Sequence, residues 1–232
     1  MTLHSASPIS NSSHSNFGKK LPRFIAIEGP IGVGKTSLTK RLADSFNYDV
    51  LLEKSDENPF LERFYHNPTQ HALTTQLFFL FQRAQQIQDM RQDDMFEPVR
   101  IADFLIDKDQ LFARQNLDAD EYELYLNVYQ HLTIDAPIPD LVIYLQAPTE
   151  VLLDRIQRRG VQAEQYIDRS YLENLNSAYT EFFYYFNKTA LLIVNSAEID
   201  LVSNEDDYQQ LVDYIRSVPN GTHYFNPKAT LL

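Results

Sequence analysis

The stretch that decides the fold reads Gly29-Pro30-Ile31-Gly32-Val33-Gly34-Lys35-Thr36. It fits the pattern G-x-x-x-x-G-K-S/T, in which a tight loop turns its backbone amides toward phosphate oxygens. The apolar residues 24–28 precede it, as a buried parallel strand would, and helical spacing runs from residue 35 to about residue 46. A chance match on a glycine-rich turn explains this less well, because the whole chain has only 6 glycines. The stretch therefore predicts a phosphate-binding loop for a nucleoside triphosphate.

Two side chains of this loop have defined tasks in such a site. The ammonium of Lys35 can bridge the β- and γ-phosphates of ATP, and the hydroxyl of Thr36 can bind Mg²⁺. The motif identifies a triphosphate site without identifying the chemistry. We expect ATP to be bound by the loop and the start of the helix: Gly29, Pro30, Ile31, Gly32, Val33, Gly34, Lys35, Thr36 and Ser37.

Short apolar runs alternate with longer amphipathic segments along the rest of the chain. This alternation is typical of a doubly wound α/β fold, so we expect a central parallel sheet of about five strands with helices on both sides. Strands are expected at residues 24–28, 49–53, 99–104, 141–145 and, last in the chain, 191–194. Helices are expected at residues 35–46, 58–91 with a break around Pro68, 110–131, 149–160 with Thr149 as a cap and Gly160 at its end, 170–186 and 206–216.

The composition limits the class of protein. The 232 residues are 44% hydrophobic and 12% aromatic, which is enough for one core, and we place a single domain at residues 21–232. Residues 1–20 are expected to be a disordered tail, because residues 1–17 hold no Lys, Arg, Asp or Glu and are rich in serine.

Charge and cysteine content narrow the range of partners. The net charge of −12, from 32 acidic and 20 basic residues, repels phosphate backbones, so we expect no nucleic-acid polymer as a partner. The chain has no cysteine, which excludes a disulfide framework, a thiolate zinc site and a cysteine nucleophile. The apolar runs are well below the ~18 residues of a spanning helix, so we expect a cytoplasmic protein without a membrane partner.

Several segments together resemble the deoxynucleoside kinase family, in particular the bacterial deoxyadenosine and deoxyguanosine kinases. The likeness covers nearly the whole chain after residue 22 in the family's order. It implies a P-loop kinase fold, ATP-dependent phosphorylation of the 5′-hydroxyl of a deoxynucleoside, with a purine favoured, and a homodimer formed through helices. The matching segments are residues 27–38, 58–62, 64–65, 76–83, 141–146 and 155–165.

The residues on the acceptor side follow from this resemblance. Glu53 ends a predicted strand at the edge of the sheet where ligands bind. The resemblance implies that its carboxylate accepts the proton of the 5′-hydroxyl. Gln76 and Arg83 lie about two helical turns apart on one face; by resemblance, Gln76 binds the base edge and Arg83 frames the base or nearby carboxylates. Tyr65 and Glu164 match the residues that bind the sugar 3′-hydroxyl.

Simpler explanations exist for each of these residues. Glu53 can be a solvated carboxylate paired with Lys54, and Gln76 with Arg83 an exposed polar pair. Tyr65 can be a core residue, since the chain has 14 tyrosines, and Glu164 can be a surface charge.

An arginine-rich segment is the candidate lid over the phosphates. Helical spacing puts Arg155 on one face with Arg158 and with Arg159, where guanidinium groups can neutralise the transferred phosphoryl group. Arg155 and Arg159 match the family positions, Arg158 is additional, and Val161 replaces a further arginine. All three can instead be cations that a helix C-terminus favours. The loop containing Glu198 and Asp200 resembles the family's adenine-side loop.

One departure from the family follows the third strand. Asp103 can be the acidic residue that orients Mg²⁺ or its waters, but Phe104 stands where an arginine is expected. The register there is open by one residue, so Lys108 and Asp109 cannot be placed near the base from sequence. The role of the arginine is either absent or filled by another residue.

Two other functions are consistent with the phosphate-binding loop. A nucleoside monophosphate kinase, such as a thymidylate-like kinase, needs a basic clamp for its acceptor, whereas residues 53–65 carry four acidic side chains against two basic ones. A regulatory nucleotide-binding protein would not need Tyr65, Gln76 and Glu164 at matching places. Both features favour a kinase that acts on a neutral nucleoside.

Overall fold

The computed structural model describes residues 21–93, 99–132 and 136–226, and it contains one parallel sheet. The strand order is β2-β3-β1-β4-β5-β6, and every pairing between neighbours is parallel. The strands are β1 (Phe24–Glu28), β2 (Asp49–Leu51), β3 (Arg100–Ala102), β4 (Leu141–Gln146), β5 (Ala190–Asn195) and β6 (Thr222–Phe225).

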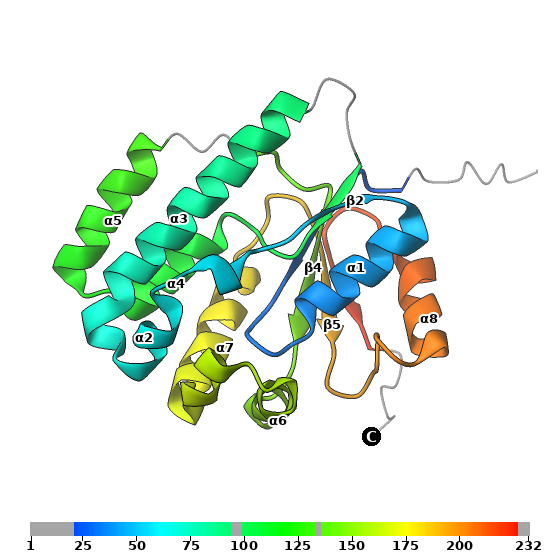
Figure 1. Cartoon of the computed structure of the whole chain (residues 1–232). Coiled ribbons are helices and arrows are strands. Elements are labelled where there is room, and N and C mark those ends of the chain that lie inside the picture. Colours follow the sequence, from blue (N-terminus) through cyan, green and yellow to red (C-terminus); the bar gives the residue numbers. More distant parts are fainter. Residues whose placement is uncertain (1–20, 94–98, 133–135, 227–232) are drawn as a thin grey trace, which may run out of the picture.

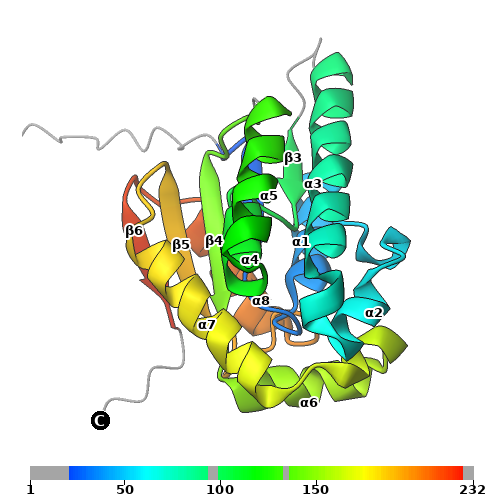
Figure 2. The ribbon, with the colours of Figure 1, turned by 90° about the vertical axis from the view of Figure 1, so that its left-hand side faces the viewer.

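The sheet lies between two layers of helices. Figure 1 shows α1 (Lys35–Phe46) and α8 (Glu205–Ile215) on one side of the sheet. Four helices lie on the other side, where Figure 2 views them face on: α3 (Pro68–Asp93), α4 (Lys108–Asn116), α5 (Ala119–His131) and α7 (Arg169–Tyr184). The remaining elements close the end of the sheet near the phosphate loop: η1 (Ser55–Glu57), α2 (Leu61–His66), α6 (Thr149–Arg159) and η3 (Gln162–Tyr166).

The central strand β4 shows why helices cover both faces of the sheet. Side chains of β4 alternate in direction, so that Leu141 and Ile143 join the cluster with α1 and α8, while Val142 and Tyr144 join the cluster with α7. All four are buried, which is the pattern of a parallel strand rather than of a sheet with one wet face. The prediction of a parallel sheet with helices on both sides is therefore confirmed.

The order of the strands determines where a ligand binds. After β1 the chain forms β2 and β3 on one side of it and later crosses to β4 on the other side, so the topology reverses at β1. Open α/β sheets bind ligands at the carboxyl ends of the strands at such a reversal. The loop that begins at Gly29 leaves β1 at this point.

Several expected boundaries were wrong. The six strands agree with the expected fold class, but β5 is not the last strand. β6 was missed because it is an edge strand in which only Phe225 is buried. The expected helix at 110–131 is two helices, since Leu117 is extended and Asp118 caps α5 in a capping box. Thr149 does not cap α6, because Pro148 holds the N-cap position.

Other expectations at the ends of elements were confirmed. The break around Pro68 separates α2 from α3, and α6 ends at Gly160, whose φ of 68° is the left-handed conformation that favours glycine. The tail at residues 1–20 lies outside the described residues. Among the described helices, none combines the length and the apolar character needed to cross a bilayer.

Candidate active site

The phosphate loop has a backbone that requires glycine. Gly29 has a φ of 148°, and a Cβ there would lie 2.5 Å from the Leu145 carbonyl oxygen; at Gly32 it would lie 2.9 Å from that of Leu152. The Lys35 ammonium donates to the carbonyl oxygens of Gly29 at 2.7 Å and Pro30 at 3.3 Å. This lysine therefore lies folded over the loop, where phosphate oxygens would replace its carbonyl partners.

Thr36 and Asp103 meet across the sheet edge. The Thr36 hydroxyl donates to Asp103 Oδ2 at 2.5 Å, and Asp103 Oδ1 accepts from the backbone amide of Glu53 at 2.6 Å. Burial raises the pKa of Asp103, although the hydrogen bonds from Thr36 and Glu53 act to lower it. A hydroxyl and a carboxylate are ligands suited to Mg²⁺. No cluster of three or more acidic, histidine or cysteine ligands occurs among the described residues.

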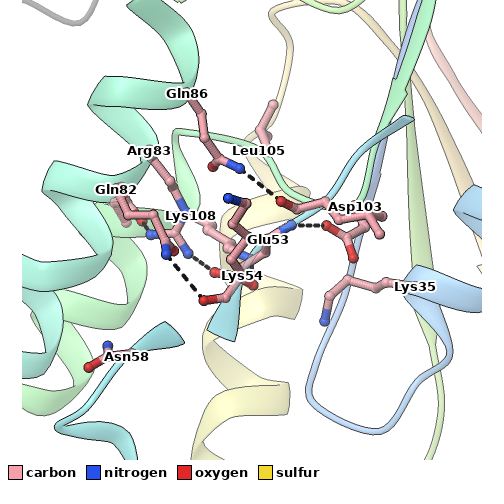
Figure 3. Close-up of polar contacts among 12 residues, drawn as sticks. Lys35, Glu53, Lys54, Asn58, Gln82, Arg83, Gln86, Asp103, Leu105 and Lys108 are labelled. Carbon is pink, nitrogen blue, oxygen red and sulfur yellow. Dashed lines mark hydrogen bonds and ion pairs between the residues drawn. The ribbon is translucent and has the colours of Figure 1, made fainter. Parts of the chain in front are cut away.

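Glu53 lies between two cations, as Figure 3 shows. One carboxylate oxygen forms an ion pair with Arg83, and the other accepts from the Lys108 ammonium at 2.9 Å. Burial would raise the pKa of Glu53, but the charges of Lys108, Arg83 and Lys35 outweigh it and lower the pKa to about 2. Glu53 is therefore an ionised and oriented carboxylate. The simpler explanation of a solvated pair with Lys54 is wrong, since Lys54 pairs with Glu57.

A cavity of about 120 Å³ opens beside Glu53. It brings together residues from seven elements or connections between α1 and η3, so the acceptor and phosphate residues share one space. Those that line it are Lys35, Thr36, Glu53, Tyr65, Gln76, Arg83, Asp103, Arg159 and Glu164. A second cavity of about 500 Å³ lies on the other side of the loop and is lined by Gly32, Val33, Gly34, Ser37, Arg155, Arg159, Glu198 and Asp200.

Gln76 and Arg83 are buried in the wall of the first cavity, so they are not an exposed polar pair. Arg83 binds Asp109 as well as Glu53, and its guanidinium lies 5.1 Å from the centre of the Phe79 ring. Among the described residues, Arg83 Nε and Asp109 Oδ2 are buried polar atoms without a hydrogen-bond partner. Such atoms are costly unless a ligand or water completes them.

Tyr65 and Glu164 approach the same cavity from α2 and η3. The Tyr65 ring packs 6.3 Å from the Tyr171 ring, and burial raises the pKa of its hydroxyl well above the usual value. Tyr65 is thus both a packing residue and a lining residue. Glu164 is largely buried and forms an ion pair with Arg159, so it is not a free surface charge.

The three lid arginines differ in their surroundings. Arg155 donates to the carbonyl oxygens of Val33 at 3.1 Å and Ser196 at 2.7 Å, and so connects the phosphate loop to the loop after β5. Arg158 is exposed and pairs with Asp154 within the helix. Arg159 lines both cavities, so its side chain lies where the two adjoin.

The loop after β5 lines the second cavity with two acidic side chains. Glu198 is exposed there, while the Asp200 carboxylate accepts from the amides of Val202 and Ser203 at 3.0 and 2.8 Å. Asp200 therefore shapes the loop, and its assignment to ATP binding stays a prediction.

Sequence reasoning did not place Lys108 and Asp109, which the structure brings into the site. Both are buried charged residues at the start of α4, a few residues after Asp103. Two charged side chains shortly after a predicted strand were a signal that could have found them. The alignment with the family after Asp103 was open by one residue, however, so neither could be placed. Phe104 is buried beside Arg83, with its ring centre 5.8 Å from the guanidinium.

The fold and this loop define a P-loop kinase. A family model for deoxynucleoside kinases matches residues 25–219, and the chain belongs to that family. It is 36% identical to a deoxyguanosine kinase of Bacillus subtilis over 203 residues, covering 84% of this chain and 97% of the relative. It is 32% identical to a deoxyadenosine/deoxycytidine kinase of the same organism, with 84% and 92% covered.

Solved structures give the same relationship. A deoxyadenosine kinase from M. mycoides with the products dCMP and dCDP superposes with a TM-score of 0.72 at 26% identity, covering 84% of this chain and 100% of that one. The same enzyme with dATP superposes with a TM-score of 0.71 over 83% of this chain and 98% of that one. The chain is accordingly an enzyme that phosphorylates deoxynucleosides.

Proposed function

We propose that this chain transfers the γ-phosphoryl group of ATP, as its Mg²⁺ complex, to the 5′-hydroxyl of a purine deoxynucleoside. The observation that carries the proposal is the ionised Glu53 in one cavity with Lys35, Thr36 and Gln76. An acceptor hydroxyl that reaches Glu53 there also faces the phosphate loop.

The donor is held by the loop and by Arg159. Lys35 would leave its carbonyl partners for the β- and γ-phosphates, and Arg159 would contact the transferred group. Thr36 and Asp103 would hold Mg²⁺, directly or through water; when bound, the ion neutralises phosphate charge.

The acceptor is deprotonated by Glu53. The 5′-oxygen forms a bond to the γ-phosphorus, the bond from that phosphorus to the bridging oxygen of the β-phosphate breaks, and ADP leaves. The hydroxyl proton passes to the Glu53 carboxylate. With a pKa of about 2, Glu53 takes this proton late, after the phosphoryl group has begun to transfer, as loose transition states permit.

The rest of the cavity recognises the nucleoside. The Gln76 amide offers a donor and an acceptor to the edge of a base, and Tyr65 with Glu164 can bind the 3′-hydroxyl. Arg83 Nε and Asp109 Oδ2, which lack a hydrogen-bond partner among the described residues, add one donor and one acceptor at the Arg83–Asp109 ion pair. The purine preference is supported by the names of the relatives, a deoxyguanosine kinase and a deoxyadenosine/deoxycytidine kinase.

A monophosphate acceptor suits this cavity less well. Arg83, Lys108 and Arg159 line it, but each already pairs with a carboxylate. A phosphate on the acceptor would have to compete with Glu53 or Glu164 for these cations. A neutral hydroxyl acceptor avoids that competition.

The test is an assay of ADP release with ATP and each of the four deoxynucleosides, with deoxyguanosine monophosphate and thymidine monophosphate as controls. We expect turnover with deoxyguanosine or deoxyadenosine and little with either monophosphate. Turnover with pyrimidine nucleosides alone would reject the purine preference. Turnover with monophosphates alone would reject the proposed acceptor.

We also propose that the chain forms a homodimer through its helices, as the family resemblance implies. Phe81 on α3 and Leu124 on α5 are half-exposed apolar side chains on helices that pack together, which supports this. Sedimentation of the full chain tests it: a particle of about twice 27.0 kDa is expected, and a monomer at micromolar concentration contradicts it.

A further inference from the structure

Lys108 is a buried cation in a position that local energetics do not favour. It is the first residue of α4, and a helix N-terminus repels positive charge. Its side chain is only 3% exposed, and burying an ammonium is strongly unfavourable unless it is paired. The reason for its placement therefore lies in its partners.

Lys108 bridges two carboxylates on different elements. Its ammonium lies 2.9 Å from Glu53 Oε2 and 3.2 Å from Glu28 Oε1. Glu28 is the last residue of β1 and directly precedes the phosphate loop. The bridge therefore connects the base of the phosphate loop to the carboxylate beside the acceptor.

Glu28 is a fixed anchor for this bridge. Its carboxylate accepts from the amides of Gly29 at 3.1 Å and Leu105 at 3.2 Å, and from the Tyr179 hydroxyl at 2.7 Å. Its side chain is 1% exposed. A carboxylate held by three donors from three segments cannot move without breaking the core around β1.

The Glu53 carboxylate, in contrast, accepts from no backbone amide of the described residues and is held by two cations. Glu53 lies two residues past the end of β2, in the connection to η1, where its amide bonds Asp103. Its side chain depends on Arg83 and Lys108 for orientation. Arg83 comes from α3 and is shared with Asp109 on the acceptor side, so Lys108 is the cation that relates Glu53 to the phosphate loop.

We infer that Lys108 is a positioning residue, which holds Glu53 at a fixed place relative to the phosphate loop through Glu28. This inference rests on the proposed role of Glu53. Reacting groups must be placed to within about 1 Å, and an error of that size can lower the rate by about 10²-fold. Loss of Lys108 should therefore lower kcat and leave nucleoside and ATP binding nearly unchanged.

The test is a double-variant cycle with Lys108→Met and Glu53→Gln. We expect Lys108→Met alone to lower kcat by about 10- to 100-fold, with nucleoside KM and ATP affinity within about 3-fold of the parent. In the Glu53→Gln background the same change should lower kcat by less than about 3-fold, because the group that it positions is gone. Lys108→Arg, which keeps the charge, should recover part of the loss.

The control is Lys188→Met. Lys188 pairs with Asp107, the residue before α4, but outside the cavity, and its loss should leave kcat unchanged. Thermal unfolding establishes that each variant is folded. If Lys108→Met does not fold, Lys108→Arg in the two backgrounds forms the cycle. The loss of kcat is then expected to be smaller, and it should again be found only where Glu53 is present.

Three results separate the two claims. Equal fold-losses of kcat in both backgrounds would overturn the positioning role of Lys108, and so would a change confined to nucleoside KM. An unchanged kcat in Glu53→Gln alone would instead reject the proposed role of Glu53 and leave Lys108 as a structural ion pair.

Discussion

Replacing Arg83 by methionine removes the cation that links Glu53 to Asp109. The Arg83 side chain is 4% exposed, and its partners Glu53 and Asp109 are 17% and 2% exposed. Removing one partner of a buried ion pair costs about 3–5 kcal/mol, because the remaining charge stays buried and unpaired. For a chain of this length, each kcal/mol lowers Tm by about 2–4 °C, so we expect a drop of about 6–20 °C.

The assay is thermal unfolding of the parent, Arg83→Met, and Arg83→Met combined with Asp109→Asn. The second change removes the unpaired charge of Asp109 and should recover about 1–3 kcal/mol. Arg216→Met is the matched control, because Arg216 and Asp213 form an exposed pair worth less than about 1 kcal/mol. A loss below about 1 kcal/mol in Arg83→Met, or no recovery in the double variant, would refute the reasoning.

Three further predictions concern the phosphate loop, the lid and pH. Lys35→Ala should abolish turnover while the chain stays folded, as measured by ADP release and circular dichroism, since the hydrogen bonds of the Lys35 ammonium to described residues go to loop carbonyls. Near-normal activity would reject the phosphate site. Arg159→Ala should lower kcat by about 10²-fold or more with a smaller change in nucleoside affinity, and a loss of Tm alone would leave it as a helix-end cation. The pKa of Glu53 is lowered from 4.5 to about 2, so the ionised carboxylate stabilises the fold. This contribution to the free energy of unfolding is fully present above pH 4.5 and is lost as pH falls toward 2. The stability advantage over Glu53→Gln, measured by urea unfolding, should therefore shrink by about 2 kcal/mol between pH 6 and pH 3, and a constant difference would contradict this.

The phosphate loop and the central strands could be predicted from sequence because their signals are local. The glycine pattern fixes the backbone of residues 29–34, and β1 and β4 are apolar runs that only a two-sided core can bury. The edge strand β6 gave no such signal, because Thr222 and Tyr224 are exposed and Phe225 is its one buried residue.

The site could be predicted only in part, because its ion pairs join segments that are far apart in the sequence. Glu53, Gln76 and Arg83 were selected by resemblance, and their ion pairs and burial became visible only in three dimensions. Lys108 is separated from Glu28 by most of the first half of the chain, and no periodicity connects them. Buried ion pairs between distant segments depend on tertiary packing, which spacing along one helix or strand does not encode.

The central claim is that Glu53 accepts the proton of the nucleoside hydroxyl. Glu53→Gln keeps the shape of the side chain and removes the base, while the loop amides, Lys35 and Thr36 are unchanged. The decisive measurement is kcat of Glu53→Gln with the preferred deoxynucleoside, together with a separate titration of ATP binding. We expect kcat to fall by about 10²–10⁴-fold, nearer the smaller value because a loose transition state needs the base late, with ATP affinity within about 3-fold of the parent. An unchanged kcat would remove Glu53 from the mechanism, and a loss of ATP binding would contradict the division of the site into a donor side and an acceptor side.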